Sequence, residues 1–118
     1  MSRVNYGTVE VTVCDETYTL KPTLKAMDKI QSRFQEAGGL RGAIAACSGM
    51  GARDLAFIVA AGAGMGQREA KDLPESVFQE GSVRVAVPVL EYLMLLINPT
   101  GREDDDEDES REDDESGE

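Results

Sequence analysis

Histidine is absent from this chain of 118 residues, and cysteine occurs only twice, as Cys14 and Cys47. Because structural zinc sites are built from cysteine and histidine ligands, this sequence excludes one. The commonest general base is also missing, and neither cysteine has an evident base beside it in the sequence. We therefore expect a protein that is not an enzyme and that holds no metal and no cofactor. The two thiols are expected to be buried or free rather than bridged.

Long hydrophobic runs are also missing. The longest apolar stretch, residues 83–97, has only 15 residues and contains Arg84, Pro88 and Glu91. A membrane-spanning helix needs about 20 apolar residues, so we expect no membrane span. The first ten residues contain no apolar segment of the kind found in signal peptides. These features together predict a cytoplasmic protein.

Acidic charge is abundant but very unevenly placed. The whole chain has a net charge of −11, and residues 102–118 hold 12 acidic residues and two arginines, a net charge of −10. This segment has no large apolar residue to bury, so we expect a domain at residues 1–101 followed by a disordered acidic tail at 102–118. The simplest role for such a tail is solubility, and docking on a basic partner is the alternative. The acids lack the spacing of a Ca²⁺ loop.

The first strongly patterned segment predicts a β-hairpin. Val9, Val11 and Val13 alternate with polar residues, and Tyr18 and Leu20 do so again after a polar break. With residues 15 and 16 as the turn, Val13 would face Tyr18 and Val11 would face Leu20. All the apolar side chains then share one face of the hairpin.

The chain next passes from strand to helix through Tyr18-Thr19-Leu20-Lys21-Pro22-Thr23, in which Pro22 ends the strand and Thr23 is a suitable helix cap. This step resembles the tail assembly chaperone family of gene transfer agents and related long-tailed phages. Members of that family open with a short strand pair and a Tyr-x-Leu-Arg/Lys-Pro-Thr step. The likeness continues with Ala26 and Ile30 and extends loosely to about Ile97. Many relatives carry glycine at the hairpin turn, where this chain has Asp15-Glu16.

The resemblance implies a non-enzymatic chaperone in the bacterial host cell. Such proteins bind the tape measure protein and tail tube protein while the tail is assembled and are usually absent from the finished particle. We expect no direct binding of nucleic acid by this chain. A homo-oligomer is compatible with this role. Two alternatives stay open. One is a minor tail or tail tube component that is retained in the particle, and the other is an acidic regulatory or nucleic-acid-mimicking protein.

Apolar residues recur at helical spacing through the rest of the body and predict four or five short helices. The first runs over 24–37 with an apolar stripe, and Gly38 and Gly39 end it. The others are expected at about 40–47, 52–61, 73–80 and 82–97. The 52–61 helix is apolar nearly all round, so it should be the central one. The stripe of the first helix consists of Leu24, Met27, Ile30 and Phe34.

Three local features of the last two helices carry specific expectations. Asp72 and Glu75 should form a capping box around Pro74, with Val77 and Phe78 pointing inward. Ser82 should cap the last helix. Pro88 lacks a backbone N–H and should kink that helix or split it.

The run Gly62-Ala63-Gly64-Met65-Gly66 invites comparison with a phosphate-binding loop. Such a loop needs a strand before the glycines and a Gly-Lys-Ser/Thr after them. Here an apolar helix precedes the run and no such motif follows. A flexible loop between helices is the favoured interpretation.

The end of the last helix is more apolar than one buried face requires. It is either a fully buried core helix or a helix with an exposed seam that binds another chain. Tyr92, Met94 and Leu96 are the candidate partner-binding residues on this segment. The expected fold class is α+β, mainly α, with an N-terminal β-hairpin packed on a small bundle of four to five short helices.

Overall fold

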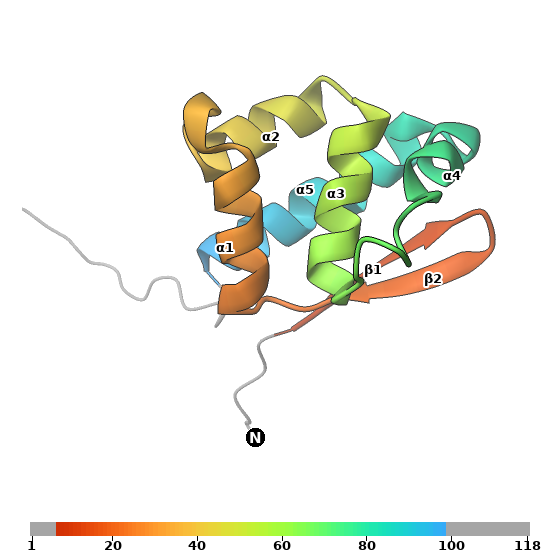
Figure 1. Ribbon diagram of the computed structural model, residues 1–118, viewed down its shortest axis with the longest axis horizontal. Coiled ribbons are helices and arrows are strands. Elements are labelled where there is room, and N and C mark those ends of the chain that lie inside the picture. Colours follow the sequence, from red (N-terminus) through yellow and green to blue (C-terminus); the bar gives the residue numbers. More distant parts are fainter. Residues whose placement is uncertain (1–6, 99–118) are drawn as a thin grey trace, which may run out of the picture.

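The hairpin comes first in the fold and the helices follow it, as the α+β prediction required. The computed structural model describes residues 7–98, and Figure 1 shows the arrangement. The expected disorder of residues 102–118 and the expected boundary at residue 101 lie outside this range. The elements in chain order are β1 (Val9–Val13), β2 (Glu16–Leu20), α1 (Leu24–Arg33), a 3-10 turn η1 (Gln35–Ala37), α2 (Leu40–Ser48), α3 (Ala52–Ala63), α4 (Leu73–Glu80) and α5 (Ser82–Ile97).

The hairpin turns one residue earlier than the sequence suggested. Cys14 and Asp15 both have positive φ, 49° and 72°, as the two central residues of a type I′ turn do. Val13 therefore pairs with Glu16 and Val11 with Tyr18, so the expected Val13–Tyr18 and Val11–Leu20 pairs are wrong. The pairing is displaced by two residues, which leaves every side chain on its predicted face.

Contacts with α4 hold the turn in this form. The backbone N–H of Cys14 donates to the Glu80 carboxylate at 2.8 Å, and the Cys14 thiol donates to the carbonyl of Ser76 at 3.3 Å. On the inner face Val11, Val13 and Leu20 are all buried, as expected.

Helix α1 begins as expected but ends earlier. Thr23 caps it through a hydrogen bond from the Ala26 N–H to the Thr23 hydroxyl at 3.1 Å. The helix stops at Arg33, and η1 and two glycines with positive φ complete the bend toward α2. Leu24, expected in the apolar stripe, is 72% exposed, because the buried face of α1 is centred on residues 26 and 30 and Leu24 lies outside that face. Ala26 is buried in its place, beside Ile30.

Helix α3 is the central helix, as its apolar sequence predicted. It packs against α1, α2, α4, α5 and β2. Figure 1 shows it in the middle of the molecule, between α1 on one side and α4 on the other, with α5 crossing behind. The helix extends two residues beyond the expected end, and Gly64, with φ of 73°, closes it. The predicted glycine-rich loop therefore begins with a helical residue, Gly62.

Helix α4 differs from expectation in its N-terminal cap and in which side chains face the core. Asp72 stands at the N-cap position, but its side chain makes no capping bond, so the predicted capping box is absent. Val77 is buried, whereas Phe78 is 72% exposed rather than inward. A helix of two turns that packs one side on α3 buries only one of two adjacent side chains.

Helix α5 is continuous through Pro88, so the proline does not split it. Gly81, with φ of 108°, occupies the N-cap position. Ser82 is the first helical residue and makes no side-chain cap, contrary to expectation.

Candidate protein-binding surface

Helix α5 has two apolar faces, and the first belongs to the core. Its six buried residues recur at the spacing of one helical face. This buried set consists of Val85, Ala86, Val89, Tyr92, Leu93 and Leu96. The Tyr92 hydroxyl donates to the carbonyl of Lys21 at 2.5 Å, and the Lys21 N–H donates to the carbonyl of Gly62 at 3.0 Å. These bonds tie α5 to the end of β2 and to α3.

Gly62 allows α3, α5 and the end of β2 to pack closely together, because it has no side chain. A Cβ atom built on Gly62 would lie 2.9 Å from the ring of Tyr92 and 3.0 Å from the Cβ of Leu20. Real Cβ atoms essentially never come closer than 3.0 Å to another heavy atom, so the contact with the Tyr92 ring would force a shift. The first glycine of the predicted loop is thus a packing residue, which places α5 firmly against α3.

The second apolar face of α5 points outward, and we call it the α5 stripe. Its members follow one another at spacings of 4, 3, 4 and 3 residues, so they occupy an arc of about 80° on an ideal helix. Four of them are more than half exposed and the middle one is half-buried. The α5 stripe consists of Val83, Val87, Leu90, Met94 and Ile97.

The three predicted partner-binding residues divide between these faces. Tyr92 is fully buried and Leu96 is 4% exposed, so neither can contact a partner directly. Met94 is 59% exposed and lies on the α5 stripe. The remaining stripe residues were missed, although their 4-3-4-3 spacing was a readable signal. The spacing is hard to see in the sequence because the apolar residues of the buried face alternate along the chain with those of the α5 stripe.

A groove of about 570 Å³ runs beside the C-terminal half of the α5 stripe. Gly7–Glu10 of the β1 side form one wall, and Glu91, Met94 and Ile97 are among the residues of the other. Val13 and Glu16 are the hydrogen-bonded pair next to the two-residue turn. The backbone N–H and C=O groups of residues 9, 11 and 13 therefore point toward β2. Glu10 and Thr12 therefore present the outer edge of the strand.

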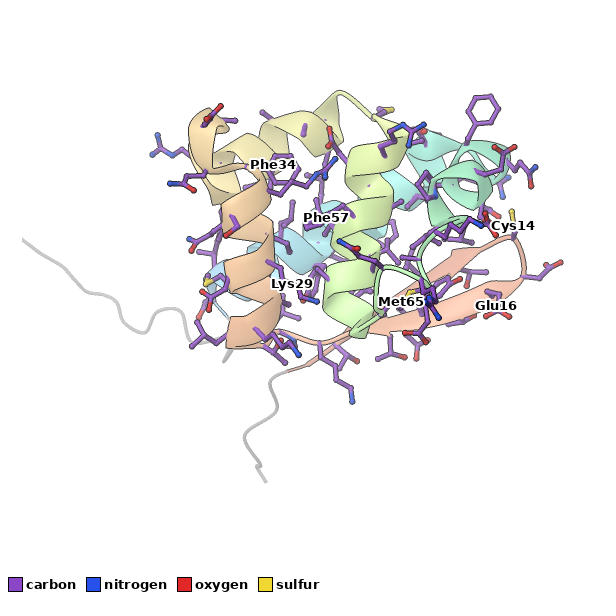
Figure 2. All side chains as sticks on the ribbon, viewed as in Figure 1. Cys14, Glu16, Lys29, Phe34, Phe57 and Met65 are labelled. Carbon is purple, nitrogen blue, oxygen red and sulfur yellow. The ribbon has the colours of Figure 1, made fainter. Side chains whose placement is uncertain are left out.

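A second groove, of about 640 Å³, lies between α1 and α3. Figure 2 shows Phe57 and Lys29 in this space, and Met65, which follows α3, also lines the groove. Arg33 stacks over the Phe57 ring at 4.7 Å and pairs with Asp54 at 3.1 Å. The Arg33 charge is already paired with Asp54, and the other charged lining residues, Asp28 and Lys29, have opposite signs, so the lining has no net excess of charge.

The titratable groups of the core are held neutral. Burial, with a smaller contribution from Asp54, raises the pKa of the Cys47 thiol to about 12. Burial also raises the pKa of Tyr92 to about 12. A thiol with this pKa is not a nucleophile at neutral pH. Within residues 7–98 there is no group of three or more His, Cys, Asp or Glu residues placed to hold a metal ion.

Among the helices of the described part, none combines the length and the apolar character needed to cross a membrane. Apart from Tyr92 and Cys47, the same residues contain no buried charged or polar side chain. The described surface carries an exposed apolar face on α5 and an outer strand edge on β1, two kinds of surface through which proteins can recognise other proteins.

Comparison of the chain with protein-family models, with curated proteins and with solved structures finds no match.

Proposed function

We propose that this protein is a non-enzymatic tail assembly chaperone of the gene transfer agent and long-tailed phage type. It acts in the cytoplasm of the bacterial host, where it holds the tape measure and tail tube proteins during tail morphogenesis. The resemblance of the hairpin-to-helix step Tyr18–Thr23 suggests the family. The α5 stripe supplies a surface suited to the role.

The observation that carries this proposal is the unpartnered apolar face of α5. Val87, Met94 and Ile97 are 66%, 59% and 53% exposed, respectively, on a helix whose opposite face is locked into the core. Single exposed apolar residues are ordinary, but a continuous row of them marks an interaction surface. The neighbouring β1 edge adds backbone groups that an extended client segment could pair with.

Co-expression with the tape measure protein of the same gene cluster tests this function. The wild-type chain should raise the soluble yield of that protein, and the Met94→Glu variant should not. Leu24→Glu is the matched control, because Leu24 is also a large exposed apolar residue but belongs to a different helix, α1. Apolar burial is not screened by salt, so raising the ionic strength should weaken the complex little.

Two results would argue against this mechanism. Equal loss of soluble yield with Met94→Glu and Leu24→Glu would show that the α5 stripe is not the client site. A complex that forms only at low salt, and only when residues 102–118 are present, would move the function to the acidic segment. Recovery of the protein in purified particles would instead favour a retained tail component.

A further inference from the structure

We propose that the α5 stripe also binds a second copy of this chain, in an antiparallel helix pair related by a two-fold axis. The inference rests on the structure of α5 and does not depend on the proposed function. It assigns one occupant, a second copy, to a surface that is otherwise open in the described residues.

The spacing of the stripe is that of a coiled-coil seam. Its 4-3-4-3 pattern places apolar residues alternately at the d and a positions of a heptad. In an antiparallel pair each a residue meets a d residue of the other helix. Val83 then packs against Met94 of the second copy and Val87 against Leu90 of the second copy. The two-fold axis repeats both contacts, which gives four apolar layers.

The charges beside the stripe complement one another in this same register. Arg84 and Glu91 lie seven residues apart on one flank of the stripe, at consecutive e positions. In an antiparallel pair, e positions face e positions. With Val87 opposite Leu90 of the second copy, Arg84 faces Glu91 of the second copy, and the symmetry gives this ion pair twice. Arg84 is available for it, because its side chain is 75% exposed and its bond to Glu80 is a long 3.6 Å.

A parallel pair lacks this complementarity. There, each e position would face a g position of the other helix. The g positions of α5 are Ala86 and Leu93, and both are buried in the protein's own core. Arg84 and Glu91 would then have no charged partner.

The position of the acidic segment favours the same orientation. Residues 102–118 follow α5 and carry a net charge of −10. In the antiparallel register the two Ile97 positions are 17 residues apart along the helix axis, or about 25 Å. This distance is several Debye lengths at physiological salt, which are about 8 Å each. In a parallel pair, both acidic segments would start from the same end of the helix pair.

The pair should be weak when the protein is alone. One helix from each copy buries less than the roughly 1,600 Å² of a standard stable interface, so dissociation in the micromolar range or weaker is expected. Because the client and the second copy use the same stripe, a client would have to displace the second copy.

Sedimentation equilibrium of the full chain from about 1 µM to about 1 mM tests the association. The average mass of the wild type should rise from monomer toward dimer. Val87→Asp should stay monomeric over the whole range. Leu24→Asp should dimerise like the wild type, because it changes an exposed apolar residue on α1 instead. Circular dichroism checks that each variant is folded. A monomeric wild type, or equal behaviour of the two variants, would overturn the proposal.

Disulfide trapping tests the orientation. In a Cys14→Ser background, where the remaining Cys47 is buried, Val83→Cys and Met94→Cys are made as two separate proteins. Mixed and oxidised, they should form the 83–94 disulfide between copies. Neither should cross-link to itself, because residues 83 and 94 lie about 16 Å apart along the helix. Self-cross-linking of either protein, or no disulfide in the mixture, would reject the antiparallel register.

Discussion

The position of α5 depends on a single glycine. Gly62 lies where the ring of Tyr92 and the side chain of Leu20 meet α3, and no room remains there for a methyl group. The Tyr92 hydroxyl in turn satisfies the carbonyl of Lys21. The outward direction of the α5 stripe follows from the packing of the opposite face, which lies against β1, α2, α3 and α4.

We expect Gly62→Ala to destabilise the fold by about 1–3 kcal/mol, the usual cost of overpacking a tight site. Gly66→Ala is the matched control, because a Cβ there would meet only the Glu69 carboxylate, at an ordinary 3.8 Å. It should change stability by about 0.5 kcal/mol or less. Urea unfolding followed by circular dichroism measures both. Equal midpoints for the two variants would show that the junction has room to relax.

The interleaving of two faces also explains which site residues the sequence could identify. Tyr92, Met94 and Leu96 were chosen together because the segment is apolar almost throughout. Only tertiary packing separates Met94 from its two buried neighbours. Phe78 and Leu24 illustrate the same limit. Both are large and apolar, yet they are exposed because each lies outside the face that its helix turns toward the core.

At the level of elements, the hairpin shows what alternation does and does not determine. The face of each strand followed from the period of two, and Val11, Val13 and Leu20 are buried as expected. The register did not follow. It depends on the left-handed conformation of Cys14 and Asp15, which α4 stabilises through Glu80 and Ser76. Those contacts join residues more than sixty positions apart, so they cannot be predicted from the local sequence pattern.

The two faces of β1 should therefore respond differently to charge. Val11→Asp places an unpaired carboxylate in the core, where Val11 is 2% exposed, and should cost several kcal/mol, in the range of about 3–5. Thr12→Asp lies on the exposed face and should cost about 0.5 kcal/mol or less. Thermal unfolding of the two variants compares them directly. Similar losses at both positions would contradict the facing of the hairpin.

At the scale of the whole molecule, the described core and the charge are separate. The buried residues run from Val11 to Leu96, while nearly all the net charge lies in residues 102–118. Residues 1–101 alone have a net charge of −1. A nearly neutral body with an exposed apolar stripe depends on charge elsewhere in the chain to remain in solution.

A chain ending at Gly101 should therefore keep its fold and lose solubility. Every core residue is retained, so its helical circular dichroism and cooperative thermal unfolding should match those of the full chain. Its solubility limit should fall, because a body of charge −1 repels its own copies weakly.

Adding Val87→Asp to the truncated chain should restore part of that solubility, since it places a charge in the middle of the α5 stripe. Adding Leu24→Asp gives the same net charge at an equally exposed site on α1 and should restore less. If both substitutions restore solubility equally, net charge alone governs it and the stripe is not the surface through which the body associates. Loss of cooperative unfolding on truncation would instead show that residues 102–118 contribute to the fold.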